Sequence, residues 1–169
     1  DALEVVRLLD QTSVDLIDIS GGTYFPGAKE ISDSPNQGPY FLDFARRAKG
    51  VTNVPLMATG GFKRREQAVG AVASGAVDMV GIARAMALDP RLAKVWLTEE
   101  GGDPDFPIFE SAPPGGITDW YITRLLALGD DQEDEFKLSL PSAMRLYRER
   151  ADQHSVQWRE KFSRPAVSG

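Results

Sequence analysis

Residues 54–90 read VPLMATGGFKRREQAVGAVASGAVDMVGIARAMALDP, and this stretch decides the fold. It predicts a buried strand, a Gly-Gly loop, a helix of small residues, a second strand and a second loop of small residues. Two consecutive strands therefore each end in residues whose backbone amides are left available to a ligand. In a (β/α)8 barrel, the loops after strands seven and eight hold a phosphate group in this way. The stretch thus indicates both a fold and a ligand class.

Helices and strands continue to alternate on either side of this stretch. We predict strands at 15–20, 54–58 and 77–82, and helices at 2–9, 40–48, 66–74, 84–88 and 90–97. The strand at 54–58 is nearly all apolar, as in a strand that is covered on both faces. An alternation with a spacing of about twenty residues predicts parallel strands joined by right-handed crossovers.

The length of the chain is short for a complete barrel. A (β/α)8 barrel usually has about 250 residues, whereas this chain has 169 and starts inside a helical pattern at Asp1. We therefore expect an α/β fold that forms the C-terminal portion of a TIM barrel, with about three βα units, from a fragment or a split gene product. A small self-contained α/β domain is the alternative.

The composition changes at residue 99, and this change predicts three regions. Residues 1–98 form the partial barrel, 99–117 a linker rich in Gly, Pro and acidic residues, and 118–169 a helical C-terminal extension. We predict helices at 118–128 and 141–162 in that extension. Three parallel strands alone leave two open edges and an uncovered face, so we expect the partial barrel to need a partner.

Composition excludes several classes of function. The net charge of −6 argues against a nucleic-acid surface. The one tight basic run in the first hundred residues, 63–65, suits a small anion. Without cysteine, thiolate catalysis and Cys-ligated metals are impossible, and the one histidine, His154, is predicted to lie on a solvated helix surface. No apolar run reaches the roughly 18 residues of a membrane span. We expect a cytoplasmic protein with no metal site.

The two glycine-containing loops are the candidate binding site. Gly60, Gly61 and Phe62 follow one strand, and the helix after them, starting near residues 63–66, presents N-terminal amides that favour an anion. Ala83 and Arg84 follow the next strand, and the planar guanidinium of Arg84 suits a phosphate. Either loop alone is compatible with an ordinary βα turn or a capped helix. The two together predict a phosphate site.

These motifs resemble those of the Old Yellow Enzyme family, the FMN-dependent NADH:flavin oxidoreductases. Residues 57–90 look like the closing strands of that family's barrel, and VDLIDISGGTYFPG at 14–27 resembles its sixth strand and substrate-side loop. The resemblance covers residues 1–98, which would correspond to the sixth to eighth βα units. It implies that the FMN phosphate is held by the amides near Gly60, Gly61 and Phe62, with Ala83 and Arg84.

The resemblance also implies a chemistry and a substrate side. In the family, NAD(P)H gives a hydride to the flavin, which then reduces the activated C=C bond of a small-molecule acceptor. Tyr24 and Phe25 would lie near the open face of the flavin, although ordinary loop packing explains them equally. The family usually has Gly-Arg where this chain has Ala83-Arg84, and alanine keeps the N–H.

No catalytic residue can be carried over from the family. Its carbonyl-binding pair and its tyrosine proton donor come from earlier strands, and no residue here matches them. The resemblance thus implies a chain that is inactive alone, with the N-terminal half of the barrel or a second copy of the chain as its partner. Another phosphate-binding barrel enzyme, an isomerase or synthase, is one alternative function, and a non-catalytic, self-associating half-barrel is another.

Overall fold

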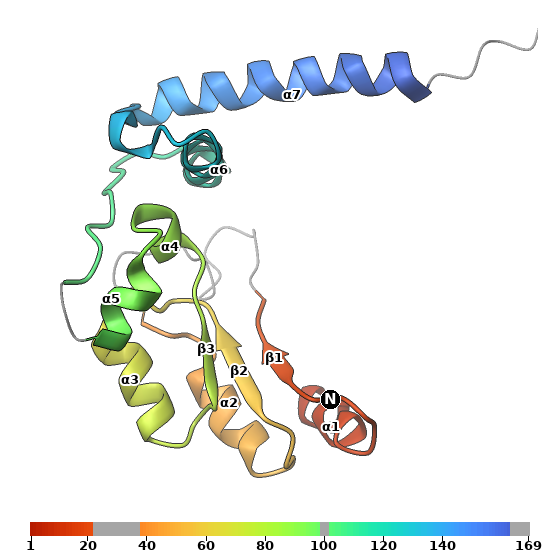
Figure 1. Ribbon diagram of the computed structural model, residues 1–169. Helices are drawn as coiled ribbons and strands as arrows, with labels where there is room; N and C mark the ends of the chain where they lie inside the picture. The colour runs from red at the N-terminus through yellow and green to blue at the C-terminus, as the bar shows by residue number, and fades with distance from the viewer. Residues whose placement is uncertain (22–37, 99–101, 163–169) are drawn as a thin grey trace, which may run out of the picture. The chain divides into compact units, whose positions relative to one another are not determined.

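The computed structural model describes residues 1–21, 38–98 and 102–162. The chain forms two compact units, Asp1–Pro107 and Ile108–Gly169. The first unit has an α/β fold with a small parallel sheet, and the described part of the second is helical (Figure 1). The boundary between the units falls inside residues 99–117, the segment in which the composition changes.

The sheet of the first unit holds the three predicted strands in sequence order. They are β1 (Ile17–Ile19), β2 (Leu56–Thr59) and β3 (Met79–Gly81), which pair in parallel as β1-β2-β3. Ile19 lies opposite Ala58, and Thr59 lies opposite Gly81. Because the strands are parallel, their carboxyl ends meet at one edge of the sheet. This α/β arrangement fits part of a (β/α)8 barrel.

One face of the sheet is covered by three helices, α1 (Ala2–Leu9), α2 (Leu42–Lys49) and α3 (Arg65–Ala73). Their small buried side chains let the helices approach the strands closely, which is typical of tightly packed interiors. The ribbon in Figure 1 shows these helices beside the three strands. The shared core consists of Ile17, Ile19, Leu56 and Ala58 from the strands and Val6, Ala45, Ala48 and Ala71 from the helices.

The other face of the sheet is only partly covered by the residues that the structure describes. Asp18, Met57 and Met79 lie across from one another on this face, and Met79 is 50% exposed. Parallel sheets normally have both faces covered. Met57 of β2 is half-buried on this face, so the expected cover of β2 on both faces stays a prediction.

Two carboxylates tie the amino ends of the strands to their neighbours. Asp78 Oδ2 accepts a hydrogen bond from the Leu56 amide at 2.8 Å and pairs with Lys49 of α2. These contacts, with the Lys49 bond as the larger cause, hold the pKa of Asp78 below its ordinary value. Asp10 accepts hydrogen bonds from the Thr52 hydroxyl and the Asn53 amide, both at 2.7 Å, which likewise lower its pKa.

Two short helices follow β3 and build a second small core. They are α4 (Arg84–Leu88), with the predicted bounds, and α5 (Leu92–Thr98). Asp89 Oδ1 accepts a hydrogen bond from the Arg91 amide at 2.9 Å, and α5 begins at Leu92, two residues after the predicted start at residue 90. Ala85, Leu92 and Trp96 form the buried cluster, and Phe106 packs against it.

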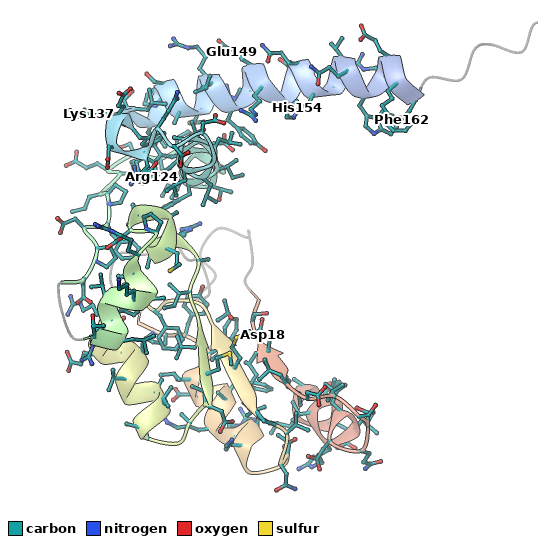
Figure 2. The ribbon with its side chains drawn as sticks, in the orientation of Figure 1. Asp18, Arg124, Lys137, Glu149, His154 and Phe162 are labelled. Carbon is teal, nitrogen blue, oxygen red and sulfur yellow. The ribbon has the colours of Figure 1, made fainter. Side chains whose placement is uncertain are left out.

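The second unit pairs two helices around a buried tryptophan. They are α6 (Gly116–Gly129) and α7 (Leu140–Phe162), with a 3-10 turn at Glu133–Glu135 between them. The Trp120 ring meets Phe109, Tyr121 and Phe136 edge-on, and its Nε1 donates to the Leu138 carbonyl at 3.0 Å. Only the first half of α7 packs on α6; residues 151–162 are exposed, and they include His154 and Phe162 (Figure 2).

Candidate functional site

A cleft of about 190 Å³ opens at the carboxyl edge of the sheet. It is lined by the residues that follow each strand, namely 20–21 after β1, 59–63 after β2 and 81–85 after β3. Tyr40 and Phe106 complete its wall. A parallel sheet collects its loops at this edge, which is where ligands bind in α/β folds.

The predicted site residues lie together in this cleft. Gly60, Gly61 and Phe62 line it from one loop, and Ala83 and Arg84 line it from the next. Their loops are neighbours because Thr59 of β2 is paired with Gly81 of β3. The other two predicted residues, Tyr24 and Phe25, lie outside the residues that the structure describes.

The loop amides at the cleft have unused hydrogen-bonding capacity. Within residues 1–21, 38–98 and 102–107, the N–H groups of Gly60, Gly61, Phe62 and Ala83 meet no protein acceptor. The Phe62 side chain is buried in the sheet core, so its backbone is held in place while its amide borders the cleft. Successive backbone donors around a concavity form a favourable place for an anion.

The start of α3 is not available to a ligand in the way the sequence predicted. The amides of Lys63 and Arg64 both donate to Gln67 Oε1, at 2.9 and 3.0 Å. The Arg65 amide donates to Asp103 Oδ1 at 2.7 Å. Gln67 reaches back as in a capping box, and the Asp103 carboxylate takes the favourable place at the positive end of the helix. The prediction that these amides hold an anion is therefore wrong.

The glycines of the first loop are required by the protein's own packing. Gly60 and Gly61 have φ values of +126° and +80°, a region that disfavours residues with side chains. A Cβ at Gly60 would lie 2.7 Å from the Tyr40 ring, and one at Gly61 would overlap the Gly38 carbonyl. The sequence predicted that a ligand would approach these glycines closely. In the structure, residues 38–40 occupy the space where their Cβ atoms would lie.

Gly81 likewise makes room for the protein rather than for a ligand. A Cβ at this position would overlap the hydroxyl of Thr59, its partner on β2. That hydroxyl donates to Asp18 Oδ1 at 2.9 Å, so the absence of a side chain at Gly81 leaves room for a side-chain hydrogen bond between β2 and β1. Asp18 is labelled on β1 in Figure 2.

Only one residue of the basic run 63–65 reaches the cleft. Lys63 lines it, with its Nζ 5.4 Å from the centre of the Phe106 ring. Arg65 is directed elsewhere, since its Nε donates to the Trp96 carbonyl at 2.7 Å. Arg84, half-buried, is the second cation of the cleft wall. Tyr40 and Phe106 were not predicted as site residues, because the sequence placed the first at the start of a helix and the second in a linker. Each is an aromatic residue beside a proline.

The described residues contain neither a metal-ligand cluster nor a membrane-spanning helix. Among them, no group of three or more His, Cys, Asp or Glu side chains could hold a metal ion. None of their helices combines the length and the apolar character needed to cross a bilayer.

Comparison with known proteins gives relatives that include three described as NADH-dependent flavin oxidoreductases. No family model matches the chain. It is 40% identical over 135 residues to the NADH-dependent flavin oxidoreductase iliE of Hypocrea jecorina (strain QM6a), an alignment that covers 74% of this chain and 33% of the relative. It is 34% identical over 152 residues to the NADH-dependent flavin oxidoreductase iccE of Talaromyces variabilis, covering 75% of this chain and 37% of that protein.

A third relative is similar over a shorter stretch. The NADH-dependent flavin oxidoreductase iliE of Neonectria sp. (strain DH2) is 36% identical over 106 residues, which is 56% of this chain and 14% of the relative. The chain thus spans about a third of the length of the first relative it matches. By these matches the chain is a homologue of NADH-dependent flavin oxidoreductases, and the predicted resemblance to the Old Yellow Enzyme family is confirmed.

Proposed function

We propose that the chain is the C-terminal, phosphate-binding part of an FMN-dependent NAD(P)H oxidoreductase with a (β/α)8 barrel. One observation carries the proposal. The loops after β2 and β3 line a single cleft, and the amides of Gly60, Gly61, Phe62 and Ala83 have no acceptor within the described part of the first unit. The relatives' names supply the flavin and NADH.

The size and charge of the cleft suit one end of FMN. Pockets that enclose a whole drug-sized ligand measure about 300–1,000 Å³, whereas this cleft measures about 190 Å³. A phosphate group fits there, with Lys63 and Arg84 in the wall to balance its charge and the loop amides to donate hydrogen bonds. The flavin ring would extend beyond the cleft, where it would supply the hydride-transfer chemistry.

The partly uncovered sheet face supports the view that this chain is one part of a barrel. In a barrel, the face bearing Asp18, Met57 and Met79 would point inward. The remaining strands, from the N-terminal half of the protein or from a second copy, would cover that face and supply the residues that bind and protonate the acceptor. The chain alone would then hold the phosphate without completing the reaction.

The proposal is tested by comparing FMN with riboflavin, which lacks the phosphate. We expect the 169-residue chain to bind FMN more tightly than riboflavin, measured by flavin fluorescence. A charge-assisted hydrogen bond contributes about 1.5–3 kcal/mol, so Arg84→Ala should weaken FMN binding by roughly 10- to 100-fold and leave riboflavin binding unchanged. Arg91→Ala is the matched control, because Arg91 is exposed and pairs with Asp89.

Two outcomes would contradict the proposal. Equal affinity of the wild-type chain for FMN and riboflavin would show that the cleft does not bind the phosphate. An unchanged FMN dissociation constant in Arg84→Ala would remove Arg84 from that site.

A further inference from the structure

The segment after α5 returns to the cleft and contributes an aromatic ring to it. We propose that Phe106 is a positioning residue that holds the Lys63 ammonium at the cleft, so that Lys63 and Arg84 act on the phosphate from two loops. The inference rests on the proposed function, because it assigns a role toward the same phosphate. It concerns residues of a segment whose composition had indicated only a linker.

Geometry places the ammonium over the ring. Lys63 Nζ lies 5.4 Å from the centre of the Phe106 ring, inside the distance of about 6 Å at which a cation is attracted to an aromatic face. Both residues line the cleft that Gly60 and Ala83 also line. The contact therefore lies at the site and not on a remote surface.

The ring is held from both ends of its segment. On one side, Phe106 packs against the buried cluster of Leu92 and Trp96. On the other, Asp103 accepts the Arg65 amide at 2.7 Å, which joins residues 103–106 to the start of α3. A ring fixed in this way restricts the position of a flexible lysine next to it.

This restriction would strengthen the interaction of Lys63 with the phosphate. A lysine side chain has many rotamers, and binding is stronger when a group is already ordered in its bound position. Arg65, two residues further along, donates its Nε to Trp96 instead, so it does not duplicate the role of Lys63 at the cleft. Phe106 thus orders the one cation of the basic run that lines the cleft, while the Trp96 carbonyl holds the side chain of Arg65 elsewhere.

The test measures the ratio of the riboflavin to the FMN dissociation constant in the 169-residue chain. A cation–aromatic contact at a partly exposed site corresponds to about a two- to fivefold change in an equilibrium constant. Phe106→Leu should lower the ratio by that factor, and Phe106→Tyr, which keeps the ring, should restore it. Phe106→Leu should have no further effect in a Lys63→Gln background, because the two residues act as one unit.

Val95→Ala is the matched control for packing. Val95 touches the same buried cluster but does not line the cleft, so its truncation should leave the ratio unchanged. An independent readout needs no ligand. The Phe106 ring should shift the NMR signals of the Lys63 side-chain protons upfield, and Phe106→Leu should abolish that shift.

Each outcome separates the inference from the proposed function. If the wild-type chain prefers FMN but Phe106→Leu has the same ratio, only the positioning role is overturned. If Phe106→Leu and Val95→Ala lower the ratio equally, the effect is loss of packing, and the role is again overturned. If the wild-type chain shows no preference for FMN, the proposed function fails, and this role fails with it.

Discussion

Gly81 occupies a position in β3 where the neighbouring strand leaves space for hydrogen only. The hydroxyl of its partner Thr59 occupies that space and donates to Asp18, so a glycine in β3 permits a side-chain hydrogen bond between β2 and β1. The sequence indicated a need for small residues here, but the contact that imposes it became visible only when β2 and β3 were placed side by side.

A first prediction follows from that contact. Gly81→Ala should displace the Thr59 hydroxyl, break its bond to Asp18 and lower the free energy of unfolding by about 1–3 kcal/mol, the usual cost of overpacking. Chemical denaturation measures this change. In a Thr59→Gly background, which removes the hydroxyl, the methyl and the Cβ that the new Cβ would meet, most of the loss should disappear. An equal loss in both backgrounds would show that Thr59 is not the cause.

At the scale of the element, two glycines in and after α3 have different backbone conformations. Gly70 lies in the helix, and nothing lies within 4 Å of the Cβ it would carry. Gly75 follows the helix with φ +70°, also in open space. The two positions therefore differ in backbone conformation and not in packing, which makes them controls for each other.

We predict effects of opposite sign for the same substitution. Gly70→Ala should raise the free energy of unfolding by about 0.5–1 kcal/mol, because alanine loses less conformational freedom in a helix. Gly75→Ala should lower it by about 1–2 kcal/mol, because a Cβ is unfavourable in the left-handed region. Thermal or urea unfolding of both variants tests the pair, and a stabilising Gly75→Ala would contradict the assigned end of α3.

The connection between α2 and the sheet should depend on pH. The pKa of Asp78 is held below its ordinary value of 3.8 by Lys49 and the Leu56 amide. A lowered pKa stabilises the folded protein above the ordinary value, and this contribution is lost as the pH falls below 3.8 toward the folded pKa. The lowered pKa of Asp10 contributes to stability with the same dependence on pH.

Asp78→Asn should therefore reduce stability near neutral pH and weaken its acid dependence. We expect the difference in unfolding free energy between wild type and variant to be constant above about pH 5 and to shrink below it. Urea titrations at several pH values measure it. Asp43→Asn is the control, because Asp43 pairs with Arg46 on its own helix and connects no elements; a pH-independent difference for Asp78→Asn would contradict the assignment.

At the scale of the whole molecule, the chain spans only about a third of the first relative it matches. We predict that the 169-residue chain, even when loaded with FMN, does not oxidise NADH or NADPH with cyclohexenone as acceptor. The reason follows from the proposed function, in which strands outside this chain would supply the groups that bind and protonate the acceptor. Turnover above that of free FMN would show that the chain carries a catalytic group of its own.

The order of the elements was readable from the sequence because it depends on local patterns. Apolar strands such as residues 56–59 and helix stops such as Gly75 and Gly129 are encoded within a few residues. The small-residue loops after β2 and β3 were predicted to adjoin because parallel strands in sequence order bring their loops to one edge. Helix bounds moved by only one or two residues for the same local reason.

What only the tertiary structure decided is which groups at that edge are already occupied. Gln67 and Asp103 take the amides of Lys63, Arg64 and Arg65, while those of Gly60 to Phe62 and of Ala83 meet no acceptor within the described part of the first unit. Tyr40 and Phe106 reach the cleft from distant segments. The sequence determined the strands, helices and loop chemistry because these depend on neighbours along the chain. The choice among donors and cations was made by contacts between segments, which no local pattern records.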